Sequence, residues 1–205
     1  MRIIAIRHAE TQWNIEKILQ GRLDSPVTEK GFRQINSLLS AIKDFPISKV
    51  ISSSSGRACT TGQVLADYFR CQMETNDNLC EQNFGILEGL SFEQAEYHYP
   101  DITSRLFAGD PTVVIPEGES TIEVAQRVIS YIQNMATNNS HATVCLITHG
   151  RTLQSMLWQL KGGNLQEEIT RYNHQNCSYS VIEVKNEQIH VARWGVATHL
   201  LNIKT

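Results

Sequence analysis

Short apolar runs alternate along this chain with longer stretches in which apolar residues recur every three or four positions. The runs at residues 3–6 and 144–147 each predict a buried strand. Further strands are predicted at residues 49–52, 178–184 and 188–194, and Asn186-Glu187 is placed to turn the last two into a hairpin. Strands that alternate with helices are typical of a mostly parallel sheet with helices on both faces.

Two helices are predicted in the first half of the chain. Thr28 is placed as the N-cap of the first, and its side chain can satisfy a free N–H group there. The apolar positions that predict one buried face of this helix are Phe32, Ile35, Leu38, Leu39 and Ile42. The second helix is predicted at residues 57–69, with Val64, Leu65 and Tyr68 facing inward.

The second half of the chain returns to regular patterns after an irregular region. Glycines and prolines break up residues 79–118, where a short helix is predicted at 92–99, and we expect this region to cover the functional edge of the sheet. A capping box at residues 120–123 begins a helix to about residue 136. Another helix runs from about residue 151 to 160, and we expect residues 1–205 to form one domain.

Composition and charge narrow the class of protein. Hydrophobic residues make up 41% of the chain, enough for a sizeable core, and the net charge of −3 argues against nucleic acid as a partner. No apolar run exceeds four residues, so we expect neither a membrane span nor a signal peptide, and a cytoplasmic protein. Five cysteines without a C-x-x-C pair favour reduced thiols over disulfides.

Two of the predicted strands end on a histidine. His8 follows the first strand and His149 follows the strand at 144–147, so both side chains are expected at the ligand-binding edge of the sheet. A neutral imidazole is a competent nucleophile toward a phosphoester, and Arg7 beside His8 would grip phosphoryl oxygens, as would Arg57 at a helix start. The sequence therefore predicts a phosphate pocket.

Six separated motifs occur in one order along the chain. They are Arg7-His8-Ala9-Glu10-Thr11 with Trp13-Asn14, Gln20-Gly21 with Asp24-Ser25-Pro26-Val27-Thr28, Ser52-Ser53 with Gly56-Arg57-Ala58, Glu81 before Phe84-Gly85 and Glu88-Gly89, Pro116-Glu117-Gly118-Glu119-Ser120, and Thr148-His149-Gly150. Together they resemble the histidine phosphatase superfamily, in its phosphoglycerate mutase-like branch. The resemblance spans residues 2 to about 180, and it implies an α/β fold, a three-layer α/β/α sandwich with a mostly parallel central sheet.

The resemblance also implies roles for particular residues. His8 matches the nucleophile and Glu81 the general acid, with Glu88 as the competing carboxylate. The catalytic set that follows is His8, Glu81, Arg7, Arg57 and His149, with His149 a third cation if it is protonated. The substrate-binding set is Asn14, Gln20, Gly21 and Gly150. No metal site and no cofactor are expected, because arginines would repel a divalent cation and no metal-ligand spacing occurs.

These residues predict a phosphomonoester hydrolase that acts on a small phosphorylated metabolite through a phosphohistidine intermediate. A cofactor-dependent phosphoglycerate mutase is the first alternative, although Glu81 is followed by Gln82-Asn83-Phe84-Gly85 rather than the basic sequence typical of those mutases, and only Arg105 is an obvious basic candidate in the region that follows. A noncatalytic phosphoester-binding protein is the second. The oligomeric state stays open, with a homodimer as one option.

Three details of the sequence leave further questions. Cys145 and Arg151 have the C-x5-R spacing of cysteine-dependent phosphatases, a match that chance supplies readily. Ala9 stands where the family commonly has glycine, and a required positive φ would cost about 1 kcal/mol. The aromatic residues that could contact substrate, or simply pack, are Phe84, Phe92, Tyr97, Tyr99 and Phe107.

Overall fold

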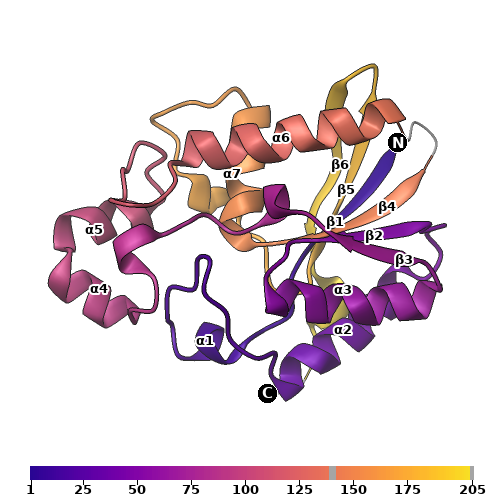
Figure 1. The fold of residues 1–205 in the computed structure, drawn as a ribbon, viewed down its shortest axis with the longest axis horizontal. Helices are drawn as coiled ribbons and strands as arrows, with labels where there is room; N and C mark the ends of the chain where they lie inside the picture. The colour runs from indigo at the N-terminus through magenta and orange to yellow at the C-terminus, as the bar shows by residue number, and fades with distance from the viewer. Residues whose placement is uncertain (139–141, 204–205) are drawn as a thin grey trace.

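The computed structural model describes residues 1–138 and 142–203, and its centre is one six-stranded sheet (Figure 1). The strands are β1 (Arg2–Arg7), β2 (Lys49–Ser52), β3 (Gln72–Thr75), β4 (Thr143–Thr148), β5 (Tyr179–Lys185) and β6 (Gln188–Val196), in the order β3-β2-β4-β1-β5-β6. Strands β1 to β4 pair with one another in parallel, whereas β5 pairs antiparallel with both β1 and β6. The predicted mostly parallel α/β sheet is confirmed.

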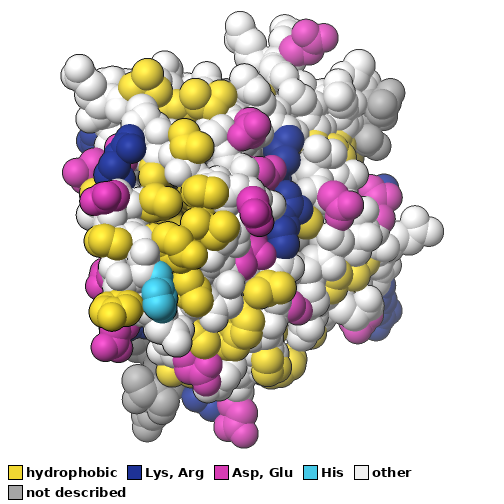
Figure 2. Space-filling view, turned by 60° about the vertical axis from the view of Figure 1, so that its left-hand side comes forward, with side chains coloured by type: hydrophobic (Ala, Val, Ile, Leu, Met, Phe, Trp, Pro, Cys, Tyr) yellow, Lys and Arg dark blue, Asp and Glu magenta, His cyan; other side chains and the backbone are white. Residues whose placement is uncertain are grey.

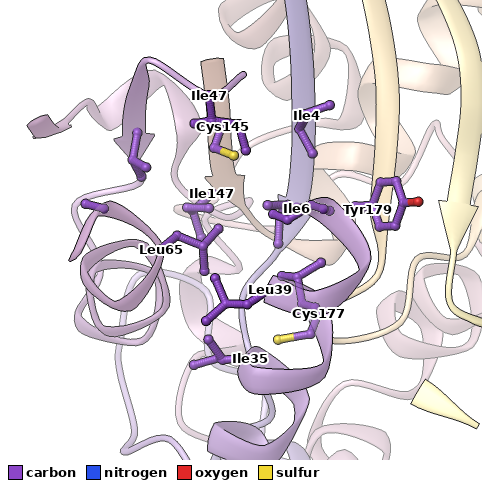
Figure 3. Packing of buried hydrophobic residues seen from close by; sticks show 14 of the residues in the cluster. Ile4, Ile6, Ile35, Leu39, Ile47, Leu65, Cys145, Ile147, Cys177 and Tyr179 are labelled. Atoms are coloured by element: carbon purple, nitrogen blue, oxygen red, sulfur yellow. The ribbon is translucent and has the colours of Figure 1, made fainter. Parts of the chain in front are cut away.

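Helices cover both faces of this sheet. The helices α2 (Glu29–Ile42) and α3 (Gly56–Phe69) lie on one face, and α6 (Thr121–Asn138) and α7 (Gly150–Leu160) lie on the other (Figure 1). Because side chains alternate along a strand, Ile4 and Ile6 of β1 pack toward α2 and α3, as Figure 3 shows, while Ile3 packs into the opposite core. The predicted three-layer sandwich is therefore present.

Local signals in the sequence set the helix boundaries. The Thr28 hydroxyl accepts a hydrogen bond from the Gly31 N–H at 2.9 Å, as an N-cap does. Ser120 and Glu123 exchange reciprocal bonds, from the Glu123 N–H to the Ser120 hydroxyl at 3.2 Å and from the Ser120 N–H to the Glu123 carboxylate at 2.8 Å. The predicted helix starts at these positions are confirmed.

The structure corrects two predicted core positions and adds one strand that was not predicted. Phe32 and Tyr68 are 44% and 50% exposed, because the buried stripes of α2 and α3 run through other positions of each helical turn. The edge strand β3 was not predicted, since its mostly polar side chains carry no apolar alternation. All five cysteines are free thiols, as expected.

A smaller set of elements lies beside the sandwich, at the left of Figure 1. It holds α4 (Phe92–His98), α5 (Pro100–Ala108) and the short 3-10 helix η2 (Gly85–Leu87), whereas the 3-10 helix η1 (Asp77–Leu79) packs against β4 and α6. The helix predicted at 92–99 ends at His98, and Pro100 begins a second helix, in the first-turn position that tolerates proline. The other short elements are α1 (Gln12–Ile15), η3 (Ile169–Tyr172) and η4 (Thr198–Leu200).

This side region has its own small core. Leu19, Phe84, Leu87 and Leu106 are among its buried members, so the region is anchored by apolar contacts rather than by the sheet. Figure 2 views the molecule with the left-hand side of Figure 1 turned forward. Hydrophobic side chains gather on this face, with acidic and basic residues around them. An apolar surface of this kind lies where the sequence predicts a cover over the site.

Candidate active site

The two histidines predicted at strand ends lie next to each other. β1 and β4 are neighbouring parallel strands, in register from Arg2 and Thr143 to Arg7 and Thr148, so both chains leave the sheet at the same edge. The His8 N–H donates to the Thr148 carbonyl at 2.9 Å, which fixes the first turn after β1. The ring centroids of His8 and His149 are 5.1 Å apart, although the residues are 141 positions apart in the sequence.

The His8 imidazole is held in the form that can act as a nucleophile. Its Nδ1 lies 2.7 Å from the Ala9 carbonyl oxygen, and because a carbonyl only accepts, Nδ1 carries the proton and Nε2 keeps its lone pair. Burial lowers the pKa of His8 well below its usual value, and the positive charges of Arg57 and Arg7 lower it further. The ring is therefore neutral at physiological pH.

Arg57 is fixed by the backbone around it at the start of α3. The side chain is only 1% exposed, and Nη1 donates to the Leu23 carbonyl at 2.6 Å and to the Asp24 carboxylate at 2.9 Å. Nη2 donates to the Gly21 carbonyl at 2.9 Å. Nε has no partner, so the guanidinium is immobilised by its two terminal nitrogens and presents a free donor.

Arg7 and His149, like Arg57, each have one buried side-chain nitrogen without a hydrogen-bond partner. Nη1 of Arg7 donates to the His174 carbonyl at 2.7 Å, and its Nε has no partner. His149 Nε2 lies 2.7 Å from the Ser53 hydroxyl, while Nδ1 is without a partner. Burial, followed by the charge of Arg57, lowers the pKa of His149 well below its usual value, which argues against the third cation expected from the sequence.

Buried polar atoms without a hydrogen-bond partner are concentrated at this end of the molecule. Six buried side-chain nitrogen or oxygen atoms of the described residues lack a hydrogen bond, and three of them are Nε of Arg7, Nε of Arg57 and Nδ1 of His149. Each buried donor without a partner costs about 1–3 kcal/mol. Arg7 and Arg57 line the same cavity as the neutral His8 ring, and their free Nε–H donors fit the oxygens of a phosphoryl group. His149 is fully buried and is not among the residues that line this cavity, although its ring lies 5.1 Å from the His8 ring.

Glu81 faces the same cavity from the loop after η1. Its Oε1 accepts from the Thr152 N–H at 3.0 Å and its Oε2 from the Arg151 N–H at 3.2 Å, both in the first turn of α7. Glu88, the competing carboxylate, does not line the cavity. Its Oε1 accepts instead from the N–H groups of Arg22 and Phe84, each at 2.9 Å, and so holds two loops together.

The four predicted substrate-binding residues all line the cavity, but they are not equally free to bind. Oδ1 of Asn14 accepts from the Thr11 N–H at 3.1 Å and from Asn176 at 3.2 Å, which leaves the Asn14 NH2 group for a ligand. Gln20 already donates to the Thr11 hydroxyl at 3.0 Å and accepts from Ser25 at 3.2 Å. Its side chain therefore supports the loop.

The two glycines of this set allow close approach. Gly21 has a φ of +51°, and a Cβ there would lie 2.0 Å from the Glu88 Oε1, so no other residue fits without displacing that carboxylate. A Cβ at Gly150 would meet the Arg7 Cζ at 3.3 Å. Gly150 thus leaves room for the guanidinium that flanks His8.

Ala9 is compatible with the loop after β1. It is not among the residues of positive φ, its N–H donates to the Thr61 hydroxyl at 3.0 Å, and its carbonyl accepts from His8. The alanine methyl is fully buried in the core beside α2 and α3. The substitution for glycine therefore carries no backbone strain.

The cavity in front of His8 has a volume of about 500 Å³, much more than a phosphate needs. Phe84, Phe92 and Phe107 line it, as the sequence suggested, whereas Tyr97 is 82% exposed and Tyr99 packs in the side core. Sequence reasoning missed further lining residues. These are Ile18, Leu19, Leu106, Arg151, Gln154, Thr170 and Asn173.

Two rival chemistries do not fit this arrangement. Cys145 is fully buried in β4, burial raises the pKa of its thiol, and it does not line the cavity, so the Cys145–Arg151 spacing forms no thiolate site. No group of three or more potential metal ligands of the His, Cys, Asp or Glu type occurs among residues 1–138 and 142–203.

Within the described chain, no helix has the length and apolarity that crossing a membrane would need.

The fold and this pocket define an α/β protein with a neutral, buried histidine between two arginines at the edge of a mostly parallel sheet. A family model of the histidine phosphatase superfamily (branch 1) matches residues 3–197, and the chain belongs to this superfamily. The probable phosphoglycerate mutase GpmB of Proteus mirabilis is 30% identical over 198 residues, which cover 97% of this chain and 92% of that protein. The similar GpmB of Escherichia fergusonii is 29% identical over the same length.

Solved structures show the same fold. YhfR of Bacillus stearothermophilus superposes with a TM-score of 0.92 at 26% identity, covering 97% of this chain and 98% of that one. The mycobacterial glucosyl-3-phosphoglycerate phosphatase has a TM-score of 0.86 at 20% identity, with 95% of this chain and 99% of that chain covered. The α-ribazole phosphatase of Shigella flexneri has a TM-score of 0.82 at 20% identity, with 96% of each chain covered.

Proposed function

We propose that this protein is a phosphomonoester hydrolase that acts on a small phosphorylated metabolite through a phosphohistidine at Nε2 of His8. The observation that carries the proposal is the pair of unpartnered N–H donors, Nε of Arg7 and Nε of Arg57, that share a cavity with an imidazole whose Nδ1 is bonded to the Ala9 carbonyl. These groups would bind the phosphoryl oxygens and leave Nε2 aimed at phosphorus.

The reaction would proceed in two displacements. In the first, the lone pair of His8 Nε2 forms a P–N bond while the P–O bond to the leaving group breaks, and Glu81 gives its proton to the departing oxygen. In the second, water attacks the phosphorus, the P–N bond breaks, and the electron pair returns to Nε2. Glu81 takes a proton from that water, so phosphate is released and the enzyme is restored.

Phosphoglycerate mutase is the second candidate function. The relatives near 30% identity are named as probable phosphoglycerate mutases, and Arg151 adds a cation to the cavity wall that sequence reasoning did not assign to binding. Arg105, the basic residue considered from the sequence, is exposed, bonded to Asp110 at 2.7 Å, and outside the cavity. In a mutase, the phosphoenzyme would transfer its phosphoryl group to a substrate hydroxyl instead of water.

The test follows the phosphoryl group. The protein, in a buffer that contains a metal chelator, is mixed briefly with 4-nitrophenyl phosphate labelled in its phosphoryl group, and the reaction is quenched. We expect an acid-labile, base-stable label on the protein, and continued turnover of the substrate. His8→Ala should abolish the label, while the exposed His98→Ala at the end of α4 should keep it. Full labelling of His8→Ala would remove His8 as the nucleophile, and turnover that needs one divalent ion would indicate a metallophosphatase.

A second measurement separates the candidate functions. Phosphate release without a primer supports the hydrolase, whereas phosphoglycerate isomerisation that depends on a bisphosphoglycerate primer supports the mutase. Binding of phosphoesters with neither product would leave a noncatalytic phosphoester-binding protein.

A further inference from the structure

Arg151 is a cation on the cavity wall that the proposed catalytic steps do not use. It lies in the first turn of α7, two residues after His149, and it is half-buried. Its Nη2 donates to the Leu106 carbonyl of α5. In the described part of the chain, no carboxylate forms an ion pair with its guanidinium.

This position disfavours an uncompensated positive charge. Burial lowers the pKa of Arg151 to about 10, although the negative charge of Glu81 partly offsets that effect. The start of a helix carries a partial positive charge, which also disfavours a cation there. Glu81 does not pair with the guanidinium, because its carboxylate accepts from the backbone N–H groups of Arg151 and Thr152. An anion in the cavity would compensate the charge of Arg151.

The residues near Arg151 extend a polar wall. Gln154 lies one turn further along α7 and lines the same cavity, as do Thr170 and Asn173 of the η3 segment. The side region contributes an apolar wall, in which the rings of Phe92 and Phe107 are 4.7 Å apart. The cavity therefore offers a phosphate site, an apolar surface for the body of a substrate, and a second cationic position.

We propose that Arg151 forms a second anion site, which selects phosphomonoesters whose leaving group carries a further anionic group, a carboxylate or a second phosphate. The inference rests on the proposed function only for the identity of the first site, where the phosphoryl group binds. It defines the class of substrate as a phosphomonoester that carries a second anionic group, with an apolar body between that group and the phosphoryl group.

Binding of benzylphosphonates tests the second anion site without turnover, because the P–C bond of these compounds cannot be hydrolysed. The dissociation constants of 3- and 4-carboxybenzylphosphonate are measured by calorimetry against the matching carbamoyl compounds, which are nearly isosteric and neutral at that position. A phosphonate in place of the carboxylate forms the second arm and tells which anion is preferred. A charged hydrogen bond predicts that an anionic member binds roughly 10- to 100-fold more tightly than its neutral partner.

Variants assign the preference to Arg151. In Arg151→Gln the ratio of neutral to anionic dissociation constants should fall close to one. Arg105→Gln is the matched control, since it removes the same charge from an exposed arginine outside the cavity and should keep the ratio. The ratio within one variant also cancels any general loss of affinity from a displaced Leu106.

Each outcome decides between the two proposals. Equal affinities for charged and neutral members in the wild-type protein, or a ratio that survives in Arg151→Gln, would overturn the second anion site. The same is true of a ratio that falls equally in Arg105→Gln, because that would reflect the field of the whole molecule. Failure to hydrolyse 4-nitrophenyl phosphate would count against the hydrolase alone, since the phosphonate ratios do not depend on turnover.

Discussion

The two ends of the cavity are built in different ways. At the end that holds His8, both His8 and His149 follow two hydrogen-bonded strands, and Arg57 is locked by backbone carbonyls, so the positions of these groups are set by the sheet and its loops. At the other end, Phe92 and Phe107 belong to short helices with a small separate core. The first end suits a fixed chemical step, and the second suits variation in the substrate.

The largest effect is expected at Glu81, which lines the cavity and is bonded to the first turn of α7, at the same edge of the sheet as His149. The substitution Glu81→Gln removes the proton donor, and it should slow cleavage of an alkyl phosphate by roughly 10²- to 10⁴-fold because an alkoxide is a poor leaving group. The loss should be much smaller for 4-nitrophenyl phosphate, whose leaving group departs without a proton. Single-turnover kinetics of Glu81→Gln across alkyl and aryl phosphates measure this dependence on leaving-group basicity.

Glu88→Gln is the matched control, because Glu88 lies outside the cavity and bonds to the N–H groups of Arg22 and Phe84. It should show no selective defect with alkyl phosphates. An equal loss for all leaving groups in Glu81→Gln, or the selective defect in Glu88→Gln instead, would give the proton donor's role to another group.

The same contrast explains what the sequence could predict. The strand ends at His8 and His149 were predictable, because four-residue apolar runs point to buried strands and parallel neighbours share an edge. The strand β3 was not, since its mostly polar residues at a sheet edge lack that pattern. Sequence alone could place Arg151 only by its spacing from Cys145, but its position in the first turn after His149 is a signal that it faces the pocket.

The side region was harder to predict in detail. Phe92 and Tyr97 lie on one seven-residue helix and are both aromatic, yet one lines the cavity and the other is 82% exposed. Which face of α4 is buried depends on packing against α5 and η2, and a helix this short has too few turns to show a periodic pattern.

Acid should destabilise the fold through the buried histidines near the cavity. Burial lowers the folded-state pKa of His8 and His149, and it lowers that of His174, behind Arg7, to about 3. The unfolded chain takes up protons at these histidines below about pH 6.5, while the folded chain does not. The stability they contribute is therefore complete above that pH and is lost as the pH falls, by up to about 1.4 kcal/mol per pH unit for each histidine.

Urea unfolding between pH 7.5 and 5 measures this dependence. The free energy of unfolding should fall with pH in the wild-type protein and fall less steeply in His149→Asn, while the exposed His98→Asn should retain the wild-type slope. A free energy that stays constant or rises toward pH 5 would show that the histidines are protonated in the folded state.

The smallest expected effect lies at the apolar end. Phe92 stacks near Phe107 with ring centroids 4.7 Å apart and lines the cavity, so Phe92→Ala should raise KM for an aryl phosphate roughly 2- to 10-fold relative to glycerol phosphate, which is too small to use the apolar wall. Tyr97→Ala on the same helix should leave the ratio of the two KM values unchanged, because Tyr97 lies outside the cavity. Steady-state kinetics with both substrates test this, and an equal shift for both would mean that the apolar end supports the fold but does not choose the substrate.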